Sequence, residues 1–104
     1  MIVRLWKGRA RTQSADAYQR HVVTSVFPKL RELHGYLGGR VLRRDLGDRI
    51  EFLVMTEWRS LDAIRAFTGD AIDRAVVEPS ARAVLTDFDE HVEHFEVVEE
   101  SKRG

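Results

Sequence analysis

The 104-residue chain contains no cysteine and no asparagine, and neither sign of charge is in excess. Without cysteine it can form no disulfide bond, thiolate nucleophile or cysteine-based zinc site, which fits a reducing compartment. Lys and Arg together number 17, as do Asp and Glu, so the formal net charge is zero. A basic field is what attracts a protein to nucleic acids and anionic membranes, so we expect neither as a partner.

Long apolar runs are also missing. No stretch approaches the roughly 20 residues that cross a membrane, and Arg4 and Lys7 interrupt the N-terminal apolar run, unlike a signal peptide. We therefore expect a cytoplasmic protein. Hydrophobic residues make up 43% of the chain, enough for one domain over residues 1–100, while residues 101–104 should fray as a tail. A domain this short buries a modest share of its surface, so a partner subunit would stabilise it.

The first part of the chain predicts a strand and a long helix. Residues 2–10 alternate loosely, as in a strand with both faces partly buried. Ser14 is the expected N-cap of the helix. Pro28 should kink or split the helix about one turn earlier, and Gly35 should end it. The apolar stripe of this helix consists of Tyr18, Val22, Val26, Leu30 and Leu33.

Residues 50–58 carry the strongest strand signal, and they follow a strand at residues 40–45 and a tight turn. One face of this strand carries Ile50, Phe52, Val54, Thr56 and Trp58, and the other carries Leu53 and Met55. Helices can cover only one of two apolar faces, so a second copy of the chain is the simplest cover for the other. The residues we expect to be buried between subunits are Leu53, Met55, Val92 and Val98.

The second half predicts a helix and a last strand. Ser60 should cap a helix with Leu61, Ile64 and Phe67 on its apolar side. Short helical segments are expected over residues 71–77 and 81–85, before a strand over residues 90–99. The resulting order is βαββαβ, the α+β arrangement of ferredoxin-like folds. Its connections imply an antiparallel sheet with the helices on one face.

Three stretches resemble the antibiotic-biosynthesis monooxygenase-like group of the dimeric α/β barrel superfamily. They are LHGYLGG at residues 33–39, FLVMTEWRSLDA at residues 52–63 and VEHFEVV at residues 92–98. The resemblance spans nearly the whole chain and implies a homodimer, a dimeric α/β barrel formed through the sheets. It specifies function less closely, because the superfamily includes oxygenation of aromatic polyketides without a cofactor, haem degradation, lactone isomerisation and ligand sensing.

The resemblance also suggests where the site lies. In these relatives the pocket lies between sheet and helices, and the Trp that ends the third strand often lines it, which corresponds to Trp58. A core position for Trp58 is the alternative. Haem-degrading relatives use a histidine in the second helical region and an asparagine in the first strand. Residues 71–77 contain no histidine and the chain has no asparagine, which argues against haem degradation. The Trp, Asn and Arg set of the oxygenase relatives is incomplete for the same reason.

Arg4, Trp6 and Phe67 are the other candidates for binding or stabilising a substrate. Arg4 and Trp6 share one face of the first strand, so they could supply a cation for a phenolate or enolate and a wall for stacking. Phe67 would add a second aromatic wall. The alternative is a pair exposed at an edge, or an Arg4 that is paired with a glutamate of a neighbouring strand.

Two histidines are candidates for a general base. His94 lies in the last-strand motif, and His21 lies beside the apolar stripe of the first helix. Each could instead be structural, His94 as a hydrogen-bonded residue of the barrel or dimer interface and His21 at the helix boundary. His91 and His94 point to opposite faces of a strand, so they cannot share a metal. The acidic run at residues 87–90 fits no calcium loop. We expect no metal and no cofactor.

These observations lead to one hypothesis and one alternative. In the first, aromatic walls exclude water, His94 or His21 removes a proton from a small planar aromatic or enolisable metabolite, and Arg4 stabilises the anion. Such an anion can reduce oxygen without metal or flavin, as in a cofactor-independent monooxygenase, and the same groups could act as an isomerase. In the alternative, a non-catalytic or stress-associated dimer sequesters a small ligand. An ionisable side chain inside the cavity would favour the enzyme.

Overall fold

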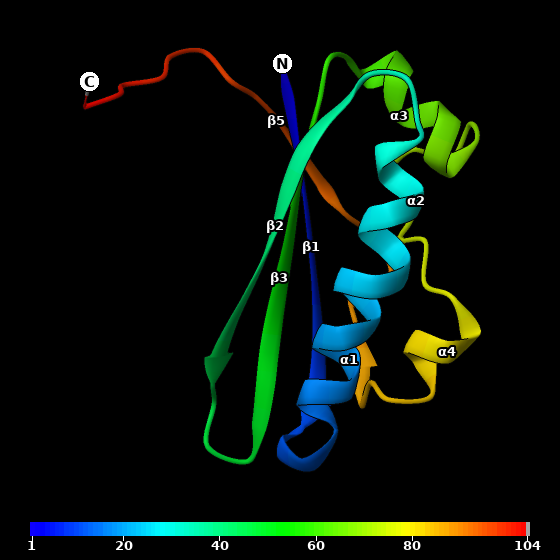
Figure 1. The fold of residues 1–104 in the computed structure, drawn as a ribbon, viewed down its shortest axis with the longest axis vertical. Coiled ribbons are helices and arrows are strands. Elements are labelled where there is room, and N and C mark those ends of the chain that lie inside the picture. Colours follow the sequence, from blue (N-terminus) through cyan, green and yellow to red (C-terminus); the bar gives the residue numbers. More distant parts are fainter. Residues whose placement is uncertain (104) are drawn as a thin grey trace.

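Two ten-residue strands, β1 (Ile2–Arg11) and β3 (Arg49–Trp58), pair along their whole length at the centre of an antiparallel sheet (Figure 1). The computed structural model describes residues 1–103. The sheet order is β2-β3-β1-β4, with β5 also pairing with β1. The expected α+β, ferredoxin-like arrangement is therefore confirmed. The outer strands are β2 (Tyr36–Asp45), β4 (Asp87–Phe88) and β5 (Glu93–Glu96).

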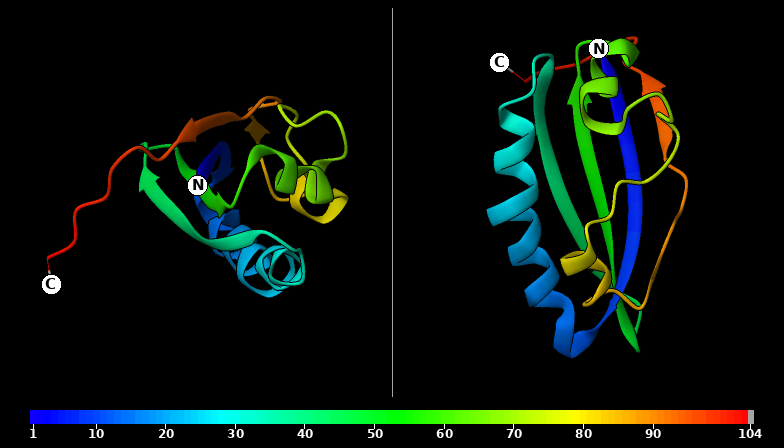
Figure 2. Two further views of the ribbon diagram at one scale, coloured as in Figure 1. Left: turned by 90° about the horizontal axis from the view of Figure 1, so that it is seen from above. Right: turned by 90° about the vertical axis from the view of Figure 1, so that its right-hand side faces the viewer.

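A helical layer covers one face of this sheet, and the other face is left open (Figure 2). The layer has a long continuous helix on one side and a shorter group of elements on the other. Residues 70–78, which we call the strap, run between α3 and α4 over the central strands (Figure 2). The helical elements are η1 (Thr12–Ser14), α1 (Ala15–His21), η2 (Val22–Val26), α2 (Phe27–Arg31), α3 (Leu61–Thr68) and α4 (Pro79–Arg82).

The long helix changes its hydrogen-bond register one turn before Pro28, where a kink was expected. In η2 the Phe27 N–H donates to the Val22 carbonyl, which is π-helical spacing. Proline has no N–H to donate and its ring crowds the preceding turn, so a wider turn accommodates it. The wide turn also keeps the apolar stripe of the long helix on the side that is buried against the sheet. Residues four apart drift by about 40° per step around an ideal α-helix, yet Tyr18 and Leu30 are both buried.

The two predicted N-caps differ in outcome. The Ser60 hydroxyl accepts the Ala63 N–H at 3.1 Å, as predicted for the start of α3. Ser14 does precede α1, but its side chain makes no capping hydrogen bond in the described structure. The reason is local: Ser14 is the last residue of the 3-10 turn η1, with ψ of −7° in place of the extended backbone that a capping residue usually adopts.

The expected helix over residues 71–77 is absent from the described structure, and the last strand is interrupted. The Ala75 N–H donates to the Glu90 carbonyl and the Val92 N–H donates to the Asp73 carbonyl, both at 2.8 Å. Residues 90–92 therefore pair with the strap, so that the strand expected at residues 90–99 is reduced to β5. The helix expected at residues 81–85 begins earlier, as α4, with Pro79 in its first turn.

The open face of the sheet carries an apolar surface, as the sequence predicted for Leu53 and Met55. Strand register places six side chains there, away from the helices: Val3, Leu5, Leu42, Leu53, Met55 and Phe95. Val92, which was expected on the same face, instead lies on the helical side and is 8% exposed, because its backbone follows the strap. Val98 is 85% exposed in the segment after β5, which leaves the body of the protein (Figure 1).

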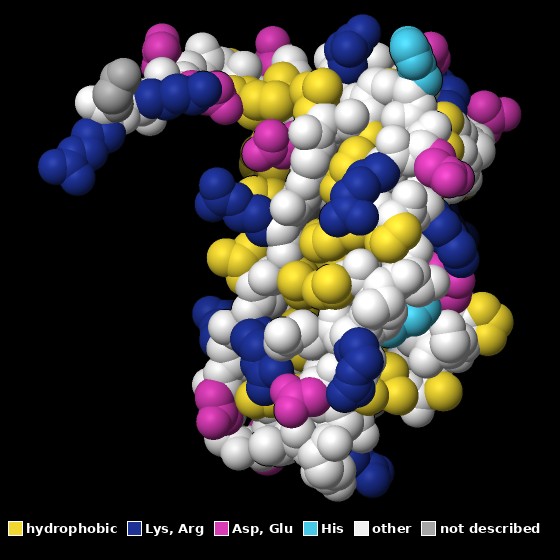
Figure 3. Space-filling model, in the orientation of Figure 1, with side chains coloured by type: hydrophobic (Ala, Val, Ile, Leu, Met, Phe, Trp, Pro, Cys, Tyr) yellow, Lys and Arg dark blue, Asp and Glu magenta, His cyan; other side chains and the backbone are white. Residues whose placement is uncertain are grey.

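The surface carries both signs of charge. Basic and acidic side chains are interspersed over the face that displays β2 and the long helix (Figure 3). Among residues 1–103, no helix has the length and apolar character needed to cross a membrane. Residues 101–103 have no regular secondary structure, and Gly104, the end of the expected frayed tail, lies outside the described residues.

Gly35 joins the long helix to β2 and provides a test of this packing. It has φ of +91°, and a Cβ added to it would lie 2.6 Å from the Ala63 Cβ. Gly47 has a similar φ of +98° but open space around it. We expect Gly35→Ala to lower the free energy of unfolding by about 2–4 kcal/mol, from strain plus overlap. Gly47→Ala should cost about 1–2 kcal/mol, from strain alone.

Urea unfolding of both variants measures the difference between their free energies of unfolding. The double variant Gly35→Ala with Ala63→Gly should recover most of the extra loss, because it removes the overlapping methyl group. Equal losses for Gly35→Ala and Gly47→Ala would contradict the close packing of Gly35 against Ala63 of α3.

Candidate functional site

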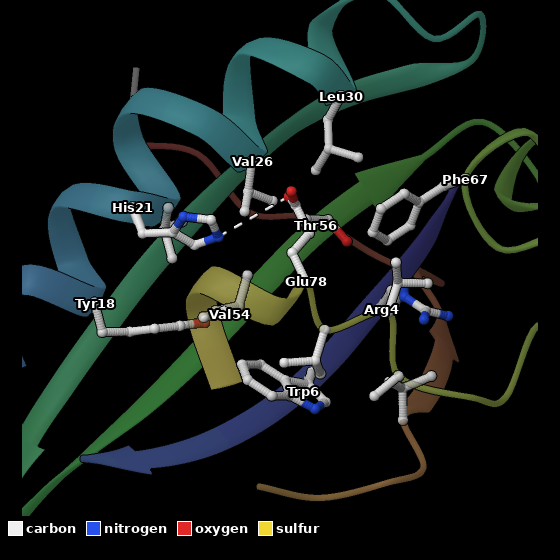
Figure 4. Close-up of a pocket in the computed structure, with 16 residues that line it drawn as sticks. Arg4, Trp6, Tyr18, His21, Val26, Leu30, Val54, Thr56, Phe67 and Glu78 are labelled. Carbon is white, nitrogen blue, oxygen red and sulfur yellow. Dashed lines mark ion pairs between the residues drawn. The ribbon is translucent and has the colours of Figure 1, made fainter. Parts of the chain in front are cut away.

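A cavity of about 70 Å³ lies between the sheet and the helical layer, beneath the strap. Its walls come from β1, β3, the long helix, α3 and the strap, and most of the lining side chains are apolar (Figure 4). The polar or ionisable residues that line it are Arg4, Trp6, Tyr18, His21, Thr56 and Glu78. The cavity therefore combines apolar walls with a few polar groups, which is typical of small-molecule sites.

The structure brings together four of the six residues that the sequence analysis selected: Arg4, Trp6, His21 and Phe67 line the cavity. The lining does not include Trp58 or His94. The ring of Trp58 is fully buried, stacks on Phe67 at a centroid distance of 6.1 Å, and donates its indole N–H to the Thr56 hydroxyl at 2.9 Å. Trp58 thus supports the wall from behind Phe67 and Thr56.

Trp6 forms a rigid aromatic wall. Its ring lies along β1 over Gly8, where an added Cβ would come within 2.7 Å of the ring. Its indole N–H donates to the Asp89 carbonyl at 2.7 Å. The ring also contacts Tyr18 and Phe88, with centroid distances of 6.3 and 6.1 Å. With its polar atom satisfied outside the cavity, Trp6 offers a ligand its apolar surface.

Arg4 ties the strap to the sheet. Its side chain is 4% exposed, and its guanidinium donates to the Ile72 carbonyl at 2.5 Å and to the Arg74 carbonyl at 2.8 Å. A third contact, of 3.0 Å, joins it to Nε2 of His94. Burial lowers the pKa of Arg4 to about 10, against the opposing effect of the Asp73 carboxylate. Arg4 therefore remains a cation at neutral pH and anchors the strap backbone.

His94 acts on Arg4. A guanidinium only donates hydrogen bonds, so Nε2 of His94 must accept. This assigns the proton to Nδ1, which lies 3.4 Å from the Asp73 carboxylate. Burial and the neighbouring Arg4 cation lower the pKa of His94, although Asp73 opposes them. The lone pair of His94 is therefore occupied by Arg4, which leaves His21 as the histidine with a nitrogen facing the cavity.

His21 presents that nitrogen from the end of α1 (Figure 4). Its Nε2 is buried and has no hydrogen-bond partner among residues 1–103. Oε1 of Glu78 lies 3.9 Å from it. The other oxygen of Glu78 accepts a hydrogen bond from Lys29 at 2.9 Å. An imidazole with an unused nitrogen and a carboxylate nearby can accept a proton and stabilise the resulting cation.

Tyr18, Thr56 and Glu78 line the cavity but were not predicted as site residues. Tyr18 was counted as part of an apolar stripe, although its spacing of three residues from His21 places both on one side of the helix and could have identified it. Thr56 was assigned correctly to the inner face of its strand. No local pattern marks Glu78, because only the path of the strap brings it to His21.

The comparisons with known proteins agree with the fold. The family model for antibiotic biosynthesis monooxygenase matches residues 1–94. No curated protein matches the chain. Among solved structures, the heme-degrader MhuD from Mycobacterium tuberculosis, with two hemes in its active site, is similar with a TM-score of 0.62. The identity is 24%, over 98% of this chain and 100% of MhuD.

Two further structures are similar. A variant of MhuD with two manganese protoporphyrin IX molecules per active site has a TM-score of 0.70 and 23% identity, over 98% of this chain and 99% of that one. SnoaB, a cofactor-independent oxygenase from Streptomyces nogalater, has a TM-score of 0.59 and 13% identity, over 95% of both chains. At these identities the likeness concerns the fold.

The interaction between His94 and Arg4 predicts a pH dependence. Because the pKa of His94 is lowered in the folded protein, the unfolded chain binds the proton more readily. Stability should therefore fall as the pH drops through the ordinary histidine range, about pH 7 to pH 5. His94→Gln should reduce this fall. Thermal unfolding across the pH range measures it, with exposed His34→Gln as the control; equal slopes in wild type and His94→Gln would contradict the assignment.

Proposed function

The chain belongs to the antibiotic biosynthesis monooxygenase family, and we propose that it is a cofactor-independent monooxygenase acting on a small planar aromatic or enolisable metabolite. The reaction takes place in the cavity beneath the strap. The observation that carries the proposal is the unpartnered Nε2 of His21 in an otherwise largely apolar cavity. The ionisable groups there favour an enzyme over a passive binding protein.

In this proposal His21 is the general base. Its Nε2 removes a proton from a C–H or O–H group of the ligand, and the electron pair stays on the ligand as an enolate or phenolate. The Glu78 carboxylate stabilises the imidazolium that forms. The walls formed by Trp6 and Phe67 hold the planar anion and exclude water, which strengthens the electrostatic interactions inside.

Dioxygen is the second substrate. The electron-rich anion reduces it, and one oxygen atom enters the ligand. When a ring methylene becomes a ketone, the two hydrogens leave with the other oxygen atom as water, so atoms and electrons balance. No step uses Arg4 as the anion-stabilising cation, because its guanidinium is engaged with the strap and His94.

The size of the cavity restricts the ligand. At about 70 Å³ it is well below the roughly 300–1,000 Å³ of typical pockets for drug-sized molecules. A molecule of no more than one ring suits it better than a tetrapyrrole. Haem degradation, which the sequence argued against, remains compatible with the similar structures, since MhuD is a heme-degrader. A haem would require the strap to move away from the long helix.

A panel of phenols, hydroquinones and single-ring enolisable ketones, with oxygen consumption as the readout, tests the proposal. We expect His21→Gln to reduce the rate by about 100-fold or more, the usual contribution of a general base. His34→Gln changes an exposed histidine outside the cavity and should retain the rate.

The other outcomes decide between the remaining functions. Isomerised product without oxygen uptake would identify an isomerase, and tight binding of panel members without turnover would favour the ligand-sequestering alternative. Haemin should bind weakly; stoichiometric binding of haemin followed by loss of its absorption would favour haem degradation. Full activity in His21→Gln would remove the basis of the proposed mechanism.

We also propose that residues 1–100 form one domain of a cytoplasmic homodimer joined through the open sheet face. The six apolar side chains on that face form a contiguous surface that helices do not cover. An exposed apolar surface of this kind marks an interface, and a twofold axis would place the same surface on both partners.

Leu53→Arg tests the dimer, because it adds a charge at the centre of the open face. We expect sedimentation velocity at micromolar concentration to show a dimer for wild type and a monomer for Leu53→Arg. Leu61→Arg makes the same change at an exposed position of α3 and should remain dimeric. A wild-type monomer would contradict this part of the proposal.

A further inference from the structure

We propose that the hydroxyl of Tyr18 binds and stabilises the ligand oxygen that becomes negatively charged, while His21 takes the proton. This inference rests on the proposed function and adds to it the substrate class: small molecules in which a phenol or enolisable carbonyl oxygen can lie against Tyr18. It also transfers to Tyr18 the role that the sequence analysis assigned to Arg4.

Tyr18 is positioned to contact a ligand in the cavity. Its side chain is 3% exposed, yet the residue lines the cavity. No side-chain hydrogen bond within residues 1–103 involves its hydroxyl, and the oxygen is not among the buried unpartnered atoms, so it is accessible from the cavity; Figure 4 shows the hydroxyl end directed into the cavity. A hydroxyl that no protein group engages can bond a ligand without breaking a hydrogen bond within the protein. An unused hydroxyl inside an apolar cavity is therefore a binding point.

Tyr18 and His21 lie close enough to contact one ligand together. They are three residues apart on α1, with ring centroids 6.4 Å apart and planes tilted by 40°. Both rings point into the same space, and no hydrogen bond joins them (Figure 4). One group donates and the other accepts, so a ligand oxygen can contact Tyr18 while its own or an adjacent proton faces His21.

The burial of the Tyr18 phenol determines its protonation state. Burial raises the pKa of Tyr18 well above its ordinary value. The hydroxyl therefore keeps its proton across the neutral range and serves only as a donor toward an anion. In the step we infer, Nε2 of His21 removes a proton from the ligand, the electron pair moves to the ligand oxygen, and the Tyr18 O–H donates a hydrogen bond to that oxygen without losing its proton.

Arg4 is poorly placed for the same role. Its guanidinium already donates to two strap carbonyls and to His94, and in Figure 4 it lies across the cavity from His21. A ligand that recruited it would have to compete with these contacts. Tyr18 makes no such contact and needs no rearrangement, so its hydroxyl is preorganised for an oxyanion.

Tyr18→Phe removes one oxygen atom and keeps the ring, so it tests the inference directly. The probe is para-nitrophenol, whose ionised and neutral forms differ in absorption. Wild type should bind the ionised form more tightly than the neutral form. Tyr18→Phe should weaken binding of the ionised form on the order of tenfold, the usual effect of one hydrogen bond to a charged group. Tyr36→Phe removes the same atom outside the cavity lining and should bind like wild type.

Three results would overturn the inference: unchanged binding in Tyr18→Phe, an equal loss in Tyr36→Phe, or no binding by wild type. Thermal unfolding of each variant shows that the fold is retained. His21→Gln separates this inference from the proposed function. Loss of oxygen consumption in His21→Gln together with unchanged phenolate binding in Tyr18→Phe would retain the base and reject Tyr18. Full oxygen consumption in His21→Gln would reject the proposed function, whatever Tyr18 does.

Discussion

A buried guanidinium holds this structure's site together. Arg4 projects from the central strand and binds two carbonyls of the strap, a segment without regular secondary structure of its own. Backbone carbonyls in such a segment need partners when they are covered, and a buried cation needs acceptors. Here the Arg4 guanidinium supplies the donors that the strap carbonyls need, and the carbonyls supply the acceptors that the guanidinium needs. The strap in turn forms one side of the cavity and carries Glu78 to His21, so the site depends on an interaction that takes no part in the chemistry.

The wide turn of the long helix has a comparable effect on the other side of the cavity. Pro28 cannot continue a regular hydrogen-bond ladder, and η2 absorbs the mismatch with π-helical spacing. The result is that Val22 and Val26 stay on the same side as Tyr18 and line the cavity together with it. The apolar wall that η2 adds beside Tyr18 thus follows from how one proline is accommodated.

Local patterns were sufficient for the parts of the protein in which neighbours in sequence are neighbours in space. The alternation at residues 50–58 identified which side chains face the helices, and Ser60 identified the start of α3. The same reasoning failed over residues 71–77 and 90–99. There, hydrogen bonds between the strap and residues 90–92 compete successfully with helix formation and with pairing to β1, and no periodicity within either segment records that competition.

The sequence by itself determined the βαββαβ order of the main elements, the two apolar faces of the sheet and four of the residues around the cavity, because strand and helix periodicity act over a few residues. Only the tertiary structure decided what those residues do. It directed Arg4 and His94 toward each other, moved Trp58 behind the wall, left Nε2 of His21 without a hydrogen-bond partner among residues 1–103, and placed Tyr18 in the cavity lining. The physical reason is that a polar group acquires its role from its partners, and most of these partners come from distant parts of the chain.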